Sequence, residues 1–211
     1  MVTKKMDPRV IKTRNNLRRA LVSLMQRESL SSISVQKITE TAHITRGTFY
    51  LHYKDKQDFI QTALQDFIDD LFANVMITPP DRRASRVFSL KCAFAYIEQN
   101  ADVFTVLLGK SVGERFYDQL FERLQGEMMA YVRETRLQVD HSAVPLELQI
   151  DFVVSAVLGV ISRWLDQGLV YTSRYMTLNV AKMLNGAEGL TPPVTTFFDA
   201  QLQVELGIQP A

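Results

Sequence analysis

Cysteine is almost absent from this 211-residue sequence, and long apolar runs are missing altogether. Because Cys92 is the only cysteine, neither an intrachain disulfide nor a cysteine-based zinc site can form. The longest apolar run, residues 152–162, is much shorter than the roughly 20 residues that a membrane-spanning helix needs. The charged N-terminus also lacks the apolar stretch of a secretory signal. These absences predict a cytoplasmic protein with no membrane partner.

Sustained alternation of apolar and polar residues, which is typical of a half-buried β-strand, is missing as well. Apolar residues recur instead at steps of three and four, and proline pairs at 79–80 and 192–193 fall between the periodic stretches. With 46% apolar residues, the chain can bury a substantial core. The fold class is therefore expected to be all-α.

The formal net charge of +1 hides a strong asymmetry along the chain. Residues 1–56 hold 12 of the 24 basic residues but only 4 of the 23 acidic ones, a net charge of +8. Residues 57–211 hold the other 12 basic and 19 acidic residues, a net charge of −7. A strongly basic N-terminal quarter beside an acidic remainder indicates a segment that faces a polyanion.

The basic quarter has the start signals of four helices. Asp7, Ser34, Thr45 and Asp55 are each placed to cap a helix, and Pro8 suits a first helical position. Two short helices joined by a tight turn, with a longer helix on each side, describe a helix-turn-helix unit. The expected helices cover residues 8–28, 35–42, 45–52 and 55–76.

The stretch TRGTFYLHYKDK, residues 45–56, carries the most functional information. Phe49 is expected to anchor a short helix inward, which leaves Arg46 and Tyr50 on its outer surface. Arginine can make a bidentate contact to guanine or pair with a phosphate. Gly47 would let the backbone approach DNA closely, at a cost of about 1 kcal/mol in helix stability. Contacts from tyrosine and lysine to phosphates would fix the register on DNA without reading its sequence.

The segments ISVQKI at 33–38 and AHITRGTFYLHYKDK at 42–56 resemble the DNA-binding domain of the tetracycline-repressor (TetR) family. The resemblance extends over about residues 10–60, with His43 at the turn position where the family usually has glycine. It implies a homodimer that places two helix-turn-helix units in successive major grooves of a double-stranded DNA operator. The two-fold symmetry of such a dimer implies a nearly palindromic operator.

Residue by residue, the resemblance assigns DNA contacts to both short helices. Arg46, Gly47 and Thr48 would begin the recognition helix. Lys56 would hold the DNA backbone, and Ser34 would touch a phosphate while capping its own helix. The candidate DNA-binding residues are Ser34, Thr45, Arg46, Gly47, Thr48, Tyr50, His52, Tyr53, Lys54 and Lys56.

Residues 1–56 would then form the helix-turn-helix DNA-binding domain, and residues 57–211 the effector-binding and dimerisation domain. Further helices, expected at about 82–100, 102–109, 113–138, 145–168, 173–186 and 194–206, indicate a helical bundle. Aromatic and methionine side chains could line a pocket for an unknown small-molecule effector, although ordinary helix packing is the commoner role for any one of them. The candidates are Phe72, Met76, Phe94, Phe104, Phe116, Met128, Phe152 and Trp164.

The same bundle would supply the contact between two copies of the chain. Ala156 and Gly159, three positions apart, would permit two helices to approach closely. The helices at 145–168 and 173–186 could pair with their counterparts in a second copy as a four-helix bundle. The candidate dimer residues are Ala156, Gly159, Leu169, Val180, Met183 and Leu184.

The sequence and the resemblance together predict a ligand-responsive transcriptional regulator, most often a repressor that a small molecule releases from DNA. An activator or a ligand-independent regulator of the same fold is an alternative, as is a module that binds a membrane surface or a protein partner. A small all-α enzyme is the alternative from a different class. Against it, His43, His52 and His141 are scattered without metal-ligand spacing, and no glycine-rich phosphate loop is present. No cofactor is expected.

Overall fold

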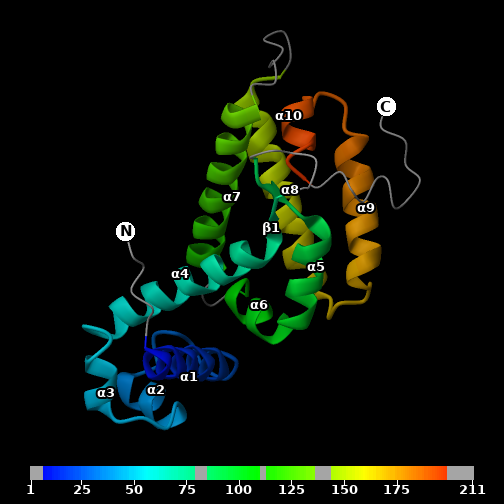
Figure 1. Cartoon of the computed structure of the whole chain (residues 1–211). Helices are drawn as coiled ribbons and strands as arrows, with labels where there is room; N and C mark the ends of the chain where they lie inside the picture. Colours follow the sequence, from blue (N-terminus) through cyan, green and yellow to red (C-terminus); the bar gives the residue numbers. More distant parts are fainter. Residues whose placement is uncertain (1–6, 79–84, 110–112, 136–143, 199–211) are drawn as a thin grey trace.

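The computed structural model describes residues 7–78, 85–109, 113–135 and 144–198 of the chain. Over these ranges the protein forms ten helices and one two-stranded antiparallel sheet, which confirms the all-α prediction except for that sheet. A small unit of three helices lies at one end of the molecule, and the long helix α4 leads from it into a larger helical bundle (Figure 1).

Each helix of the N-terminal unit begins where the capping signals predict. The side chains of Asp7, Ser34, Thr45 and Asp55 accept hydrogen bonds from backbone N–H groups in the first turns of the four helices. The first and third helices end earlier than expected, because an apolar repeat does not mark the residue at which a helix stops. The helices are α1 (Pro8–Met25), α2 (Val35–Thr41), α3 (Arg46–Tyr50) and α4 (Lys56–Val75).

Ion pairs tie α1 to α4. Arg14 Nη2 lies 3.1 Å from Asp66 Oδ2, and Arg18 Nη2 lies 2.6 Å from Asp70 Oδ2. The Arg18 guanidinium also lies 4.2 Å from the centre of the Phe67 ring. Burial raises the pKa of the Asp66 carboxyl in spite of the nearby arginines. The Arg14–Asp66 pair therefore fixes the relative position of the two helices more than it adds to stability.

The turn between α2 and α3 contains a residue in an unfavourable backbone conformation. His43 has a φ of 55°, in the left-handed region that glycine adopts without steric cost. Its side chain is exposed, and its backbone N–H donates to the carbonyl oxygen of Glu40 at 3.1 Å. The turn therefore keeps this geometry despite the β-carbon of a histidine.

We expect His43→Gly to raise the free energy of unfolding by about 0.5 to 1 kcal/mol. Relief of the left-handed strain should exceed the extra backbone entropy of glycine in the unfolded chain. Thermal unfolding followed by circular dichroism would then show a higher melting temperature than for the wild type. His43→Ala is the matched control, since it keeps the β-carbon and should give no such rise. An equal gain in both variants would contradict the explanation.

The bundle consists of six further helices of the described residues, packed around a continuous apolar core. Phe94, Phe116 and Trp164 are among its largest fully buried side chains. The rings of Phe94 and Trp164 meet edge to face with their centres 5.4 Å apart. Helix α5 packs on α9, and α7 packs on α8 (Figure 1). The helices are α5 (Leu90–Gln99), α6 (Ala101–Leu107), α7 (Gly113–Thr135), α8 (Leu146–Asp166), α9 (Ser173–Asn185) and α10 (Pro192–Thr195).

A short sheet takes the place of part of the helix predicted at 82–100. Strand β1 (Met76–Ile77) pairs antiparallel with β2 (Val87–Phe88), and α5 begins only after its cap at Ser89. The two apolar residues of β2 suit a helix or a strand equally well, and the pairing with β1 decides between them. Residues 82–84 lie outside the described part of the chain.

The helix predicted at 194–206 is also wrong where the structure describes it. Helix α10 ends at Thr195, and Phe198 forms a parallel bridge with Phe88 of β2. That contact joins distant parts of the chain, so the local apolar pattern could not reveal it. The later residues of this prediction, and the end of the one at 113–138, lie outside the described residues.

Helix α8 is long and apolar enough, by length and composition alone, to cross a membrane. It has 21 residues, with a mean hydropathy of 1.5 over its most apolar 18-residue window. Half of that window is buried inside the bundle. Such a composition is shared by the core helices of soluble proteins, so it does not by itself identify a membrane span. The apolar run at 152–162 is the middle of this longer helix.

Candidate DNA-binding surface

A cluster of aromatic rings holds α3 in place at the end of the three-helix unit. Phe49 is fully buried, as predicted, and its ring centre lies 5.5 Å from those of both Tyr53 and Phe59. The rings of Tyr53 and Phe59 also meet, with centres 4.9 Å apart. Because packing engages one side of this short helix, its opposite side faces outward.

The outer side of α3 presents most of the residues expected to meet DNA. Arg46, Gly47 and Tyr50 are exposed, Tyr50 to 56%. Thr45 accepts the backbone N–H of Thr48 at 3.1 Å, and the two hydroxyls lie 2.9 Å apart. A β-carbon on Gly47 would meet only the Thr45 hydroxyl, at an ordinary 3.7 Å. A strict requirement for glycine there would therefore come from DNA rather than from the free protein.

A chain of hydrogen bonds joins α3 to α2 across the turn. Arg46 Nη2 donates to Gln36 Oε1 at 2.5 Å, and Gln36 Nε2 donates to Glu40 Oε1 at 2.9 Å. The chain orients the Arg46 guanidinium beside the surface of α2. Gln36 was missed as a candidate, because the sequence does not show contacts between helices. The four-residue spacing of Gln36 and Glu40 on one helix was the only available signal.

Three other candidates lie at the ends of the short helices. Ser34 is exposed and accepts the backbone N–H of Lys37 at 3.2 Å. Lys54 is exposed, whereas His52 is half-buried with its ring centre 6.2 Å from that of Tyr53. Ser34 and Lys54 are thus accessible to a phosphate group.

Tyr53 was expected on the DNA side, and the structure contradicts this. The residue is only 4% exposed, and its hydroxyl oxygen is buried. Burial raises the pKa of this hydroxyl against the opposing effect of the nearby Arg14. Tyr53 lies just after α3, but its backbone N–H donates to the carbonyl oxygen of Phe49 at 3.0 Å, so the helical turn continues and places both rings on the same buried side. The side chain supports α3 from inside rather than touching a phosphate.

Lys56 has a different role from the DNA-backbone contact expected of it. Its Nζ donates to the carbonyl oxygens of Ile33 at 2.8 Å, Leu30 at 3.2 Å and Ser31 at 3.4 Å. A lysine ammonium has three donors, and all three point at this connection between α1 and α2. Lys56 therefore closes the loop that leads into α2.

We expect Lys56→Met to lower the free energy of unfolding by about 2 kcal/mol, because three carbonyls lose a charged donor. Its effect on the salt dependence of DNA binding should be negligible below the melting temperature. Thermal unfolding and binding to duplex DNA at several salt concentrations would measure the two quantities. Lys54→Met is the matched control, expected to keep the melting temperature and reduce the salt slope by about 1. A reduced slope with unchanged stability for Lys56→Met would restore the phosphate role.

Part of the basic charge in the N-terminal quarter is engaged within the protein. Arg14 and Arg18 pair with carboxylates of α4, as described above. Lys37 Nζ lies 2.6 Å from Glu28 Oε2, and this hydrogen bond lowers the pKa of the Glu28 carboxyl. The charge of +8 therefore overstates the positive field that DNA would meet.

The residues predicted to line an effector pocket are mostly packed in the core. Phe72 and Phe104 line a closed apolar space of only about 10 Å³, roughly room for one water molecule. Phe104 also lines a larger cleft, of about 580 Å³, beside α1. Phe152 is wrong as a pocket residue, because it is 60% exposed on the outer side of α8. The other candidates are buried: Met76, Phe94, Phe116, Met128 and Trp164. Of these, Trp164 also lines an open space between α8 and α9.

An apolar groove of about 510 Å³ runs between α8 and α9 on the outside of the bundle. The predicted dimer residues Ala156, Gly159, Val180 and Met183 line it. Ala156, Gly159 and Met183 are exposed, whereas Val180 is buried at the bottom of the groove. Among the described residues, no neighbouring atom lies within 4 Å of the position that a Gly159 β-carbon would occupy. The α8–α9 groove is thus open to a second molecule.

Two dimer candidates do not lie on this groove. Leu184 is wrong, since it is buried in the core of its own chain. Leu169 is partly buried in the turn after α8, with a left-handed φ of 57°. Sequence spacing on α9 placed Leu184 on the wrong side, because both sides of that helix carry apolar residues.

Several exposed apolar residues in or beside the groove were not predicted as dimer residues, and Phe152 among them was predicted for the effector pocket instead. Leu148 and Phe152 continue the outer stripe of α8, and Tyr171 and Tyr175 stack with ring centres 4.7 Å apart at the start of α9. The four-residue spacing from Leu148 through Phe152 to Ala156 was visible in the sequence. The inner stripe of α8 is equally apolar, so the sequence alone did not show which stripe stays outside.

Comparison with known proteins matches both parts of the chain to regulators. The family described as "Bacterial regulatory proteins, tetR family" matches residues 17–63. The one described as "Transcriptional regulator C-terminal region" matches residues 89–186. A solved structure of a TetR transcriptional regulator from Streptococcus agalactiae 2603V aligns with a TM-score of 0.58 at 23% identity. The alignment covers 83% of this chain and 94% of that one, and shows that the fold is shared.

Two curated relatives match over shorter stretches. The uncharacterized HTH-type transcriptional regulator YxbF of Bacillus subtilis (strain 168) is 30% identical over 89 residues. The HTH-type transcriptional repressor DhaR of Mycobacterium sp. (strain GP1) is 34% identical over 79 residues. The alignments cover 42% and 37% of this chain, but only 22% and 40% of YxbF and DhaR.

Proposed function

Because the chain belongs to the TetR family of DNA-binding transcriptional regulators, which are not enzymes, we propose that it is a homodimeric repressor that a small molecule releases from its operator. The outward-facing α3, with Arg46 oriented by Gln36, carries the proposal. An arginine at the start of a recognition helix can read guanine O6 and N7 in the major groove. Ser34 and Lys54, exposed beside it, would hold the DNA backbone.

The α8–α9 groove supports dimerisation. Monomeric proteins rarely expose large continuous apolar patches, and this face combines the groove with Leu148, Phe152 and the stacked Tyr171 and Tyr175. A second copy related by a two-fold axis would cover the same face on both chains. Such a dimer would carry two α3 helices and would therefore bind a nearly palindromic operator.

Release from DNA would depend on the link between α1 and α4. The pairs Arg14–Asp66 and Arg18–Asp70 make the three-helix unit follow any movement of α4. In a dimer, such a movement would change the separation of the two α3 helices. A small molecule can shift DNA affinity only to the extent that it binds the two arrangements differently.

Selection of binding sites from random duplex DNA tests the proposed function. We expect enrichment of a nearly palindromic site that binds at least about 1,000-fold more tightly than random DNA and weakens steeply with salt. Equal affinity for the selected site and random DNA would contradict operator recognition, and a selected site without symmetry would contradict the dimer. Transcription from a promoter carrying the site should fall when the protein is present, and a rise would identify an activator.

A further inference from the structure

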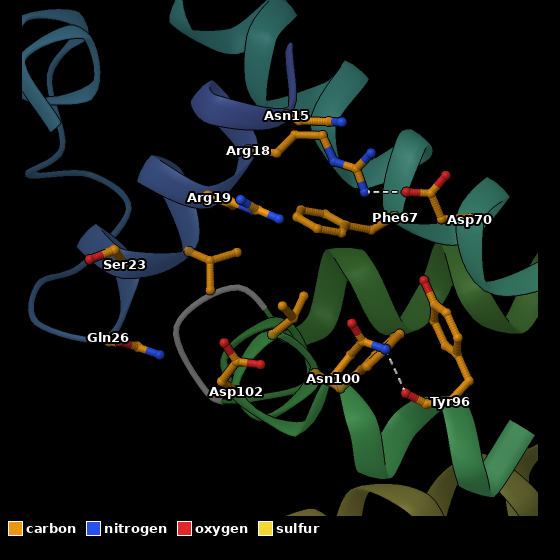
Figure 2. Close-up of a pocket in the computed structure, with 13 residues that line it drawn as sticks. Asn15, Arg18, Arg19, Ser23, Gln26, Phe67, Asp70, Tyr96, Asn100 and Asp102 are labelled. Carbon is orange, nitrogen blue, oxygen red and sulfur yellow. Dashed lines mark hydrogen bonds and ion pairs between the residues drawn. The ribbon is translucent and has the colours of Figure 1, made fainter. Parts of the chain in front are cut away.

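A cleft lies between the three-helix unit and the bundle (Figure 2). Helix α1 forms one wall, the end of α5 and the start of α6 form the other, and α4 joins them. Its volume of about 580 Å³ falls within the range of about 300 to 1,000 Å³ of small-molecule sites. An occupant of this cleft would touch the DNA-binding unit and the bundle at the same time.

The inner surface of the cleft is partly apolar. Phe67 contributes an aromatic ring, which Arg18 covers at 4.2 Å while pairing with Asp70 at 2.6 Å. Val22 and Val103 add aliphatic surface from the two walls. Arg18 pairs with Asp70 through Nη2, while its buried Nε has no hydrogen-bond partner among the described residues. Phe67 is 9% exposed, so a bound molecule would meet the edge of its ring and the neighbouring aliphatic surface. An aromatic body would release water from this surface.

Two charged side chains of opposite sign line the cleft from opposite walls. Arg19 extends from α1 toward Phe67, and Asp102 stands across from it on α6 (Figure 2). Both are exposed, and neither forms an ion pair within the part of the chain that the structure describes. The amide side chains of Asn15 and Asn100 also line the cleft, and Asn100 Nδ2 donates to the backbone oxygen of Tyr96 at 2.8 Å (Figure 2). This arrangement complements a molecule with one anionic group, one cationic group and an apolar body.

We propose that the cleft binds a small zwitterion with an aromatic body, such as an aromatic amino acid, and that this molecule is the effector of the regulator. Its carboxylate pairs with Arg19, its ammonium pairs with Asp102, and its ring lies on the surface around Phe67. Only the effect on DNA rests on the proposed function. Binding of the zwitterion to the cleft does not depend on it.

A ligand that bridges Arg19 and Asp102 fixes α1 relative to α6. Arg19 is adjacent to Arg18, whose pair with Asp70 ties α1 to α4. The position of α1 relative to the bundle in turn sets the direction of α3. The ligand therefore shifts DNA affinity by favouring one position of the three-helix unit over the other.

Calorimetric titration of the full chain without DNA tests the site, with L-tryptophan as the probe. We expect saturable binding of L-tryptophan. Tryptamine lacks the carboxylate and indole-3-propionate lacks the ammonium, and each should bind at least about tenfold more weakly because one charge-assisted contact is lost. Absence of saturable heat for L-tryptophan up to about 10 mM would overturn the proposal.

Two variants identify the side chains. Arg19→Ala should weaken L-tryptophan and indole-3-propionate about tenfold without changing tryptamine, and Asp102→Asn should weaken L-tryptophan and tryptamine without changing indole-3-propionate. Lys12→Ala is the matched control. Lys12 is an exposed basic residue of α1, like Arg19, but it lies outside the cleft, so the substitution should change none of the three affinities. Affinities that neither cleft variant alters would place any binding elsewhere and overturn the site.

Operator binding with and without L-tryptophan separates this inference from the proposed function. A change in operator affinity that disappears in Arg19→Ala supports the effector role. Unchanged operator affinity at saturating L-tryptophan overturns that role while leaving operator recognition intact. A protein that binds L-tryptophan in the cleft but recognises no operator would instead contradict the proposed function.

Discussion

Replacing Phe152 with aspartate is expected to make the protein monomeric and to weaken operator binding by about 100-fold or more. Phe152 is 60% exposed on α8, so the substitution should leave the fold of the single chain intact. In a dimer packed along the α8–α9 groove, the new carboxylate would lose its water without gaining a partner. Without the dimer, the second α3 no longer binds at the high effective concentration that tethering provides.

Size-exclusion chromatography with light scattering would measure the oligomeric state, and titration of operator DNA would measure the affinity. Phe152→Leu keeps the apolar contact and is expected to remain dimeric. A single half-site should bind the wild type and the aspartate variant with similar, weak affinity. A wild type that is monomeric at micromolar concentration, or an aspartate variant that stays dimeric, would contradict the interface.

Substitution of exposed glycines tests the same interface independently, because it adds bulk at the surface without adding a charge. Gly159 and Gly126 are both exposed on long helices, and a β-carbon on either would have no neighbouring atom of the described residues within 4 Å. Gly159→Leu should weaken the dimer, because it fills the space that a second helix would occupy. Gly126→Leu lies on α7, away from the groove, and should leave the dimer unchanged. Equal effects of the two variants would point to a loss of helix stability or solubility instead.

The sequence predicted those features that depend on neighbouring residues. Asp7, Ser34, Thr45 and Asp55 each accept a hydrogen bond from a backbone N–H a few positions on, so a cap is visible in a short stretch of sequence. The burial of Phe49 followed from the same local spacing. These local signals were enough to predict the helix-turn-helix unit and its order of helices.

Contacts between distant positions could not be predicted in the same way. Lys56 donates to the carbonyl oxygens of Leu30 and Ile33, more than twenty positions earlier in the chain. Nothing in the sequence around Lys56 distinguishes it from a lysine that faces solvent. Strand β2 exists because it meets β1, and no local pattern marks it. The wrong prediction for Tyr53 has another cause. Its four-residue spacing from Phe49 indicated a buried position, but the family resemblance, which assigned it to the DNA side, was given more weight.

The apolar candidates of the bundle failed for a further reason. Composition identifies residues that avoid water, but the core, a ligand pocket and a dimer interface all contain such residues. Phe152 and Trp164 lie on one helix and looked alike in sequence, yet one is exposed and the other is buried. The helices around α8 decide between the two positions, and their arrangement is a property of the whole fold.

Arg46→Ala is expected to lower affinity for the selected operator by about 10- to 100-fold, which corresponds to one bidentate contact to a base. Affinity for random DNA should fall by no more than about twofold. Arg46 is exposed and bonds only to Gln36 among the described residues, so the substitution should not disturb the fold. Fluorescence anisotropy with operator and random duplexes at one salt concentration would measure both affinities.

Two further substitutions separate the orientation of Arg46 from its charge. Arg46→Lys keeps the positive charge but loses the planar fork that matches guanine, so it should bind the operator nearly as weakly as Arg46→Ala. Gln36→Ala leaves the arginine in place without its hydrogen bond and should cause a smaller loss. Lys54→Ala is the control, expected to weaken operator and random DNA alike. If Arg46→Lys restored full affinity, or if Arg46→Ala weakened both DNAs equally, Arg46 would be a phosphate contact, and the reading of bases would have to come from Thr48 and Tyr50.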